Sequence, residues 1–354
     1  MNIPEDTLIV ATLQHVLGAR QDAFSAVALQ PLADTGLAHT HIRLAGTGAL
    51  ARLPKQSQLG LAPAENLAYQ AACYGRAAEG GHAPRLIDVI APSETLPRGG
   101  LIVEEIVGRA THLPEDLPAL AQALAAMHGL AAPLMKHRPP IMDPADPLQA
   151  LADEIAVQAG FLDAAALEPE TRRIIAQNLA RFHALCQAKA RPLKRLIAFD
   201  AHPGNFIIRP DGRAVLVDLE KCRYSAPPLD LAHATLYTST TWDVASSAEL
   251  SIPEVAAFYQ RWSAAMGDAG AAFQPWFVPL RRAMWLWSVT WCAKWRVLSG
   301  EAEQAENHGE DWSADKSSDA LVRHVRGRVD CYLSAAIVQR IDAEFDALDG
   351  MLNG

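Results

Sequence analysis

Several signals are missing from this 354-residue sequence, and each absence argues against a class of protein. No stretch approaches about eighteen uninterrupted apolar residues, the minimum for a membrane-spanning helix. The opening residues lack the cationic and apolar regions of a signal peptide, so we expect a soluble, cytoplasmic protein. The five cysteines are odd in number and never spaced as C-x-x-C, which argues against a disulfide framework and a cysteine-based zinc site.

Basic residues are also fewer than acidic ones. The sequence carries 31 Lys and Arg residues against 40 Asp and Glu, for a formal net charge of −9. Nucleic acids and anionic membranes both require a cationic surface, so we expect neither as a partner. A negative net charge still allows a local patch of basic residues on the surface. Half of the residues are apolar, and the length suits two domains or one two-lobed unit.

Common nucleotide and metal motifs are missing as well. No G-x-x-x-x-G-K-[ST] motif occurs, which argues against a P-loop NTPase. Pro54 follows Gly46-Thr47-Gly48 before a helix of sufficient length could form, so we interpret these glycines as a turn between strands. His39 and His41 could begin a metallohydrolase site, but no further His or Asp cluster sits at supporting spacing.

The pattern that is present predicts two unlike parts. Short apolar runs and Gly-containing turns predict strands in the first part, interrupted by a helix that begins near Pro63. The composition then changes to Ala/Leu-rich helix, and we place the boundary between residues 1–107 and residues 108–354. In the second part, residues 133–196 carry helical patterns, and residues 300–319 form a polar, acidic loop.

The most informative stretch combines a loop with a hairpin. Strand-like runs at 206–208 and 214–217 are joined by a Pro-Asp-Gly turn, which brings Asp218 back toward Asn205. A carboxylate and an amide oxygen, together with phosphate oxygens and water, suit Mg²⁺. A second carboxylate, Asp200, could accept the proton of a substrate hydroxyl group.

This stretch resembles the aminoglycoside phosphotransferase and choline kinase group of the kinase-like superfamily. Its motif reads H-x-D-x-H-x-x-N, then two strands, then I/V-D-W/F-E and P-x-x-D-L-A, and residues 199–232 match its spacing. The resemblance implies a two-lobed, protein-kinase-like α+β fold. The N-terminal lobe would bind nucleotide on a small antiparallel sheet with one key helix. The larger, mostly helical C-terminal lobe would carry catalysis and the acceptor site.

The resemblance also implies roles for single residues. Asp200 would be the catalytic base, while Asn205 and Asp218 would hold Mg²⁺ on the phosphates of ATP. Asp230 would support the catalytic loop rather than touch substrate. His128 closes a segment similar to the L-A-x-x-L-A-x-L-H helix of the family, and we interpret it as structural.

In the N-terminal part the resemblance is weaker. Residues 49–54 are similar to the strand whose basic residue contacts nucleotide phosphates and pairs with a helix glutamate. Arg52 is our candidate, with Lys55 as the alternative, and Glu65 is the expected partner. Residues 103–108 resemble the hinge, where backbone groups of Glu104 and Ile106 would meet the adenine edge.

Two departures from the motif keep a second hypothesis open. Phe199 stands where the family has its first histidine, and the phosphate-covering turn within residues 34–41 has one glycine. A degenerate nucleotide-binding module without efficient transfer would explain both.

All eight tryptophans fall between Trp242 and Trp312. Trp287, Trp291 and Trp295 recur at intervals of four, on one face of a helix. They form either a core stripe or an aromatic wall for the acceptor. In the second case a cationic acceptor would gain from cation–π attraction.

The leading hypothesis from the sequence is thus an ATP-dependent kinase that phosphorylates a hydroxyl group of a small molecule. The alternatives are a choline, ethanolamine or other amino-alcohol kinase of the same family, and the degenerate module. The oligomeric state is not set by the sequence.

Overall fold

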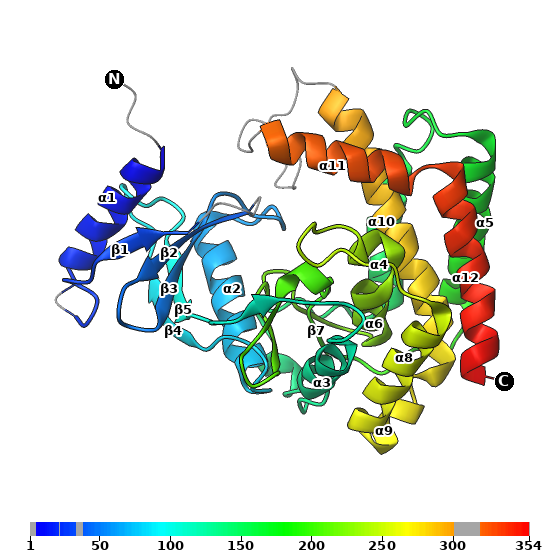
Figure 1. Cartoon of the computed structure of the whole chain (residues 1–354), viewed down its shortest axis with the longest axis horizontal. Coiled ribbons are helices and arrows are strands. Elements are labelled where there is room, and N and C mark those ends of the chain that lie inside the picture. The colour runs from blue at the N-terminus through cyan, green and yellow to red at the C-terminus, as the bar shows by residue number, and fades with distance from the viewer. Residues whose placement is uncertain (1–4, 21, 33–37, 301–318, 354) are drawn as a thin grey trace.

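The protein has two unlike parts, an antiparallel sheet near the N-terminus and a mostly helical C-terminal part (Figure 1). The computed structural model describes residues 5–20, 22–32, 38–300 and 319–353. Residues 34–37 of the expected phosphate-covering turn and residues 301–318 of the expected acidic loop lie outside the described residues. The arrangement confirms the fold class expected from the sequence.

The N-terminal sheet has five antiparallel strands in the order β1-β2-β3-β5-β4. Their bounds are Leu29–Pro31 (β1), His39–Leu44 (β2), Ala49–Pro54 (β3), Leu86–Ile90 (β4) and Gly100–Glu104 (β5). Gly46 and Gly48 take φ angles of 78° and 69° in the β2–β3 turn, a conformation that glycine adopts without steric cost. This turn joins two strands, as predicted.

Two helices belong to the N-terminal part, α1 (Glu5–Gly18) and α2 (Pro63–Ala78). Helix α1 buries Leu13 and Leu17 in a small core with the sheet residues Ile42 and Leu44. Helix α2 instead contributes its apolar side chains to the larger core, which it shares with the C-terminal part. It therefore couples the sheet to the helical part.

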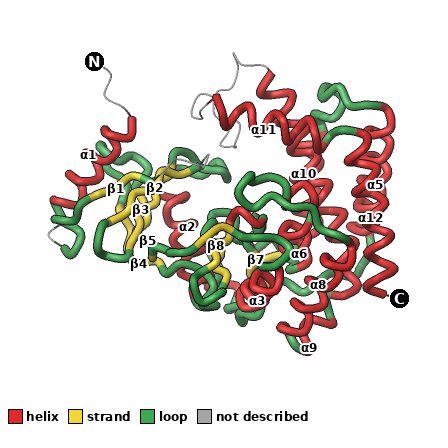
Figure 2. The backbone as a smooth tube through the Cα atoms, in the orientation of Figure 1, coloured by secondary structure: helices red, strands yellow, loops and turns green. Residues whose placement is uncertain are grey.

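The C-terminal part is built around helix α10 (Phe277–Gly300), which packs against helices from several segments (Figure 2). The other helices are α3 (Leu117–His128), α4 (Pro147–Ala159), α5 (Pro169–Gln187), α6 (Pro228–Thr235), α7 (Tyr237–Thr240), α8 (Ile252–Met266), α9 (Asp268–Ala271), α11 (Asp319–Tyr332) and α12 (Ala335–Asn353). Short 3₁₀ turns lie at Met135–His137, Pro203–Asn205 and Gln274–Trp276. None of the described helices is long and apolar enough to cross a membrane.

Short strands interrupt the helices and carry the loops of the motif. The predicted hairpin is present as β8 (Phe206–Ile208) and β9 (Ala214–Leu216), and β6 (Arg109–Ala110) pairs with β8. Strand β7 (Arg195–Ile197) pairs with β10 (Arg223–Ser225). The chain thus passes from β7 through residues 198–205 to the hairpin, and from the hairpin through residues 217–222 to β10. These two connections face the sheet and bear the site.

Candidate active site

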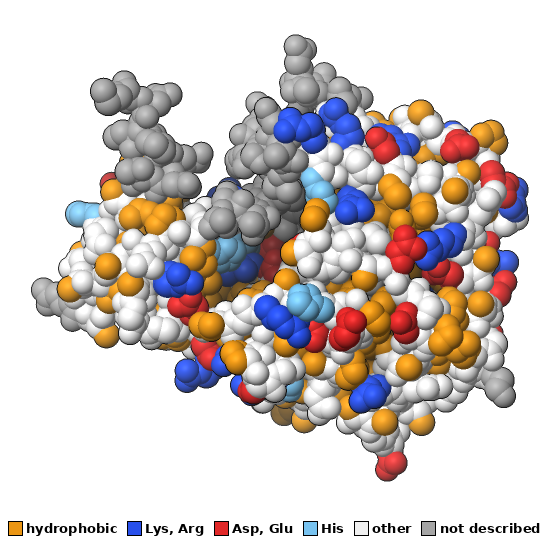
Figure 3. All heavy atoms as spheres, viewed as in Figure 1, with side chains coloured by type: hydrophobic (Ala, Val, Ile, Leu, Met, Phe, Trp, Pro, Cys, Tyr) orange, Lys and Arg blue, Asp and Glu red, His pale blue; other side chains and the backbone are white. Residues whose placement is uncertain are grey.

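A cavity of about 910 Å³ lies between the two parts, and side chains from both line it. Figure 3 shows the surface hollowed there, with basic, acidic and histidine side chains visible in the hollow. Asp200, Asn205 and Asp218 line it from the C-terminal part, and Arg52 lines it from strand β3. Two neighbouring loops of the motif therefore meet strand β3, which is distant from them in the sequence.

The loop that carries Asp200 is held by backbone contacts on both sides of that residue. The backbone N–H groups of Ala198 and Phe199 donate to the Asp230 carboxylate at 2.7 and 2.8 Å. The amide nitrogen of Asn205 donates to the backbone carbonyl of Asp200 at 2.8 Å. Phe199 takes a φ of 61°, an uncommon value for a residue with a side chain, and the Asp230 contact helps to hold it there.

Asp230 is itself held from behind by a buried chain of hydrogen bonds. Nε2 of His128 lies 3.0 Å from Oδ2 of Asp230, and Nε1 of Trp262 donates to Nδ1 of His128 at 3.0 Å. All three side chains are fully buried. The indole N–H occupies Nδ1, so the imidazole proton sits on Nε2 and points at the carboxylate. The supporting roles predicted for Asp230 and His128 are confirmed.

The Asp200 carboxylate is surrounded by basic groups. Nζ of Lys221 lies 3.0 Å from Oδ2, and Nδ1 of His233 lies 3.8 Å from Oδ1. Burial alone would raise the pKa of Asp200, but the positive charge of Lys221 outweighs it and holds that pKa well below its usual range. Burial lowers the pKa of His233 to about 4, although Asp200 opposes the shift. At neutral pH the carboxylate is ionised and able to accept a hydrogen bond from a hydroxyl group.

Asn205 and Asp218 suit the magnesium role expected of them. The Asn205 nitrogen is bound to the Asp200 carbonyl, which leaves its oxygen as the free end of the amide. With the Asp218 carboxylate it provides two hard oxygen donors on the wall of one cavity, the ligand type that Mg²⁺ prefers. No group of three or more His, Cys, Asp or Glu side chains placed to hold a metal occurs among the described residues. A metal here would therefore need phosphate oxygens and water to complete its coordination.

Arg52 does not pair with Glu65, so this part of the sequence-based prediction is wrong. Its Nη2 lies 2.5 Å from Oδ1 of Asp218, and this contact outweighs burial and raises the pKa of Arg52. Glu65 is exposed in the first turn of α2. The buried positions Asn66 and Tyr74 mark the face of α2 that meets the C-terminal part, and one residue along a helix rotates the side chain by about 100°. Glu65 therefore points to solvent.

Sequence reasoning missed a polar network behind Arg52. Nδ1 of His39 lies 3.1 Å from Nη2 of Arg52, and its Nε2 lies 3.2 Å from Oε1 of Gln70. The Gln70 nitrogen donates to Glu220 at 3.4 Å. Burial and the charge of Arg52 lower the pKa of His39. The four-residue spacing of Asn66, Gln70 and Tyr74 on one helix face is the sequence signal that could have identified Gln70.

The expected hinge also lines the large cavity. Glu104 and Ile106 both contribute to its wall. The Glu104 carboxylate is turned toward two arginines, with Arg209 at 2.6 Å and Arg85 at 3.1 Å. Its side chain is thus engaged within the protein, and contact with a base would fall to the backbone, as the prediction assumed.

The three tryptophans of the predicted stripe have different surroundings. Trp287 and Trp291 are partly buried and line the cavity. Trp295 is 3% exposed and lies in the large core, so its assignment to the acceptor wall is wrong. Each step of four residues turns a helix by about 40° beyond a full turn, and over two steps the stripe rotates away from the cavity.

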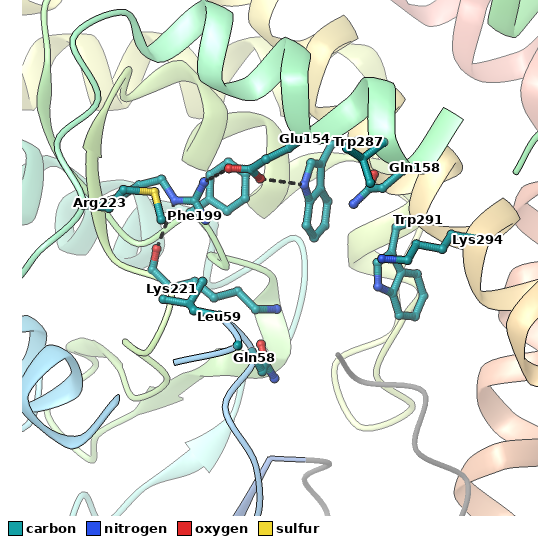
Figure 4. Close-up of a pocket in the computed structure, with 13 residues that line it drawn as sticks. Gln58, Leu59, Glu154, Gln158, Phe199, Lys221, Arg223, Trp287, Trp291 and Lys294 are labelled. Atoms are coloured by element: carbon teal, nitrogen blue, oxygen red, sulfur yellow. Dashed lines mark hydrogen bonds and ion pairs between the residues drawn. The ribbon is translucent and has the colours of Figure 1, made fainter. Parts of the chain in front are cut away.

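A smaller cavity of about 330 Å³ adjoins the large one (Figure 4). Both are lined by Gln58, Lys221, Trp287 and Trp291. Phe199 also lines the smaller cavity. The guanidinium group of Arg223 packs over its ring, with Cζ 3.7 Å from the ring centroid. Phe199, the neighbour of Asp200 in the chain, thus forms part of the wall of the smaller cavity.

Comparison with known proteins identifies the family. The profile of the phosphotransferase enzyme family matches residues 42–276, well over half of the chain. The chain belongs to this family, whose fold is that of a kinase-type enzyme. Among curated protein sequences, none matches this chain.

Solved structures of the same fold cover nearly the whole chain. A choline/ethanolamine kinase family protein from Mesorhizobium loti has 15% identity and a TM-score of 0.56, with 96% of this chain and 99% of that one covered. Ethanolamine kinase from Plasmodium vivax has 12% identity and a TM-score of 0.61, with 96% and 90% covered. A thermostable mutant of an aminoglycoside phosphotransferase, solved with AMP-PNP and hygromycin B, has 17% identity and a TM-score of 0.56, with 93% and 98% covered. At these identities the likeness shows the fold.

Proposed function

We propose that the protein is a Mg²⁺-dependent kinase that transfers the γ-phosphate of ATP to a hydroxyl group of a small molecule. The proposal is carried by one observation, the gathering of Asp200, Asn205, Asp218 and Arg52 on the wall of a single cavity between the two parts. Residues 1–107 provide the nucleotide side of this site, and residues 108–354 provide the catalytic loop and the acceptor side. A cytoplasmic location, where ATP is supplied and free thiols persist, fits the five free cysteines.

Asp200 acts as the catalytic base. Its ionised carboxylate orients the acceptor hydroxyl and accepts its proton while the acceptor oxygen bonds to the γ-phosphorus and ADP leaves. Lys221, 3.0 Å from Asp200, lines both cavities, so its ammonium group is placed to stabilise negative charge on the phosphoryl group in transit. The buried chain from Trp262 to Asp230 keeps this loop in position.

On the nucleotide side, Arg52 contacts the phosphates and Asn205 and Asp218 hold the metal. Bound Mg²⁺ would neutralise phosphate charge and orient the γ-phosphoryl group. Because Arg52 and Asp218 are paired with each other in the protein alone, nucleotide binding exchanges this contact for contacts with phosphate and metal. Backbone groups of Glu104 and Ile106 meet the base.

Phe199 does not by itself argue for a degenerate module. The Asp230 contacts that fix the loop are made to the backbone of residues 198 and 199, so they do not depend on the side chain at 199. The ring instead lines the acceptor side of the site. An active kinase is therefore compatible with this substitution.

The test is ATP-dependent phosphorylation across a panel of amines, sugars, amino alcohols and hydroxy acids. Wild-type protein should phosphorylate at least one class, and Asp200→Asn should lose transfer while retaining its affinity for Mg-ATP. Asp163→Asn, a change of an exposed carboxylate, is the matched control. Mg-ATP binding by wild-type protein without transfer to any member of the panel would favour the degenerate module.

A further inference from the structure

The smaller cavity is the place where an acceptor would lie, given the proposed function. It is walled by α4 and α10 of the C-terminal part and by residues 58–60, which follow strand β3 (Figure 4). Trp287 and Trp291 line both this cavity and the larger one. A flat group packed against them can therefore lie in the smaller cavity while an attached hydroxyl group enters the larger one, where Asp200 lines the wall.

The charged side chains that line the smaller cavity are engaged within the protein. Lys221 pairs with Asp200 at 3.0 Å, and Arg223 pairs with Glu154 at 2.5 Å. Lys294 also has a partner in the chain. A charged acceptor would have to compete with one of these contacts for its counter-ion, and breaking a largely buried ion pair leaves a charge uncompensated. The cavity is therefore suited to an uncharged acceptor.

Gln158 on α4 offers this cavity a neutral hydrogen-bond donor. Its Oε1 accepts from the hydroxyl group of Thr290 at 2.7 Å, which fixes the amide. The residue is 7% exposed and lines the cavity, and Figure 4 shows its side chain between those of Trp287 and Trp291. Among the described residues, none accepts a hydrogen bond from its Nε2. Because an unsatisfied donor in a buried position is costly, a ligand oxygen placed here would be favoured.

The apolar wall of the cavity is flat and held in place. Nε1 of Trp287 donates to Glu154 at 3.3 Å, and its ring meets Phe199 edge-on with the centroids 5.4 Å apart. The ring of Trp291 meets that of Trp242 edge-on at 5.8 Å. These contacts fix two indole rings on the wall, and such rings pack well against a flat apolar group.

We infer that this cavity takes an uncharged hydroxyl compound whose flat apolar part bears a hydrogen-bond-accepting oxygen, and that Gln158 is a specificity-determining residue. Nε2 of Gln158 donates to that oxygen, while the flat part packs against Trp287 and Trp291. The hydroxyl group faces Asp200. The inference rests on the proposed function for the identity of the site, and it differs from the cationic acceptor considered from the sequence.

The test is a calorimetric binding titration without nucleotide, with four probes that share a benzyl alcohol and differ in the group at the para position. An acetyl group provides the oxygen, an ethyl group lacks it, a carboxylate adds negative charge and an aminomethyl group adds positive charge. Wild-type protein should bind the acetyl compound about tenfold more tightly than the ethyl compound, which leaves Nε2 of Gln158 without an acceptor. Both charged probes should bind about tenfold more weakly than the acetyl compound.

A substitution of Gln158 should remove the first of these preferences. Gln158→Met keeps a side chain of similar length and lacks the donor, so it should bind the acetyl and ethyl compounds equally. Gln149→Met is the matched control, because Gln149 is an exposed glutamine on the same helix, and it should keep the wild-type preference.

Equal or tighter binding of the ethyl compound or of either charged probe to wild-type protein would overturn the inference, and so would the absence of saturable binding of the acetyl compound. An unchanged preference in a folded Gln158→Met protein would overturn the role of Gln158. The ranking of the probes by wild-type protein needs no variant, so it stays decisive if Gln158→Met does not fold. Because no ATP is present, a failure of phosphate transfer leaves these results readable, so the inference and the proposed function fail separately.

Discussion

The Nη2 atom of Arg52 lies 2.5 Å from Oδ1 of Asp218, so an ion pair joins strand β3 to the loop that follows the β8–β9 hairpin. The two residues are 166 positions apart in the chain and both line the large cavity. The pair links the two parts of the protein when no nucleotide separates them.

Removing the charge of residue 52 should weaken nucleotide binding. A charge-assisted contact contributes about 1.5 to 3 kcal/mol, so Arg52→Gln should lower the affinity for Mg-ATP about tenfold to a hundredfold. Glu65→Gln is the control, because Glu65 is exposed and should have no effect. Isothermal calorimetry measures both. A loss of affinity in Glu65→Gln equal to that in Arg52→Gln would restore the partner first expected from the sequence.

Substitutions of Trp295 and Trp291 on α10 should have different effects, the first on stability and the second on the KM for the acceptor. Trp295→Ala removes a side chain from the core and should cost about 3 to 5 kcal/mol of unfolding free energy. Trp291→Phe changes a cavity wall and should raise the KM for the acceptor with little change in stability or in the KM for ATP. Denaturant unfolding and steady-state kinetics give these values. A large loss of stability in Trp291→Phe would place Trp291 in the core as well.

The buried chain behind the catalytic loop should be costly to break. Asp230→Ala leaves two backbone N–H groups and His128 without their acceptor. We expect it to lower the unfolding free energy by about 3 to 5 kcal/mol. The milder change Trp262→Phe removes the N–H donor to His128 and part of a buried ring, and it should lower the unfolding free energy by about 1 to 3 kcal/mol. Thermal and denaturant unfolding measure both. Wild-type stability in Asp230→Ala would contradict the supporting role.

Stability should fall as the solution becomes mildly acidic. Folded protein keeps His233 neutral down to a pKa of about 4, whereas an unfolded chain takes up that proton near its ordinary pKa of about 6.5. Between these values the unfolded state binds more protons, so the unfolding free energy decreases as the pH falls, by about 1.4 kcal/mol per pH unit for this one group. Buried His39 acts in the same direction.

Urea unfolding at about pH 7 and about pH 5 measures this loss. The loss should be smaller in His233→Gln, which carries no titrating imidazole at this position. An identical loss in His233→Gln and wild-type protein would show that His233 does not contribute.

Much of the site could be predicted because its residues follow one another along the chain. Asp200, Asn205 and Asp218 lie on two loops joined by a single hairpin, so their proximity follows from local spacing. The fold class followed from the same motif together with the change in composition near Gly108. Helix α1 was not predicted, because it lies ahead of the segment that carries the resemblance, although Leu13 and Leu17 are spaced for one buried face.

The residues that could not be predicted depend on the rotation of a helix against its neighbours. Glu65 and Asn66 are adjacent in sequence, yet one is exposed and the other is buried, and only the packing of α2 decides which. The same holds for Trp291 and Trp295 on α10. The lining of the smaller cavity was also hidden, since Lys221 lies just before β10 and Arg223 within it, whereas Lys294 lies on α10.

Asp200 is the residue on which the proposed phosphate transfer from ATP to a hydroxyl group depends. The most direct measurement follows the γ-phosphate of labelled Mg-ATP into an acceptor from the hydroxyl panel, with wild-type protein and with Asp200→Asn. We predict transfer by wild-type protein and a loss of about a hundredfold or more in Asp200→Asn at unchanged Mg-ATP affinity. Equal transfer by both proteins would contradict the account.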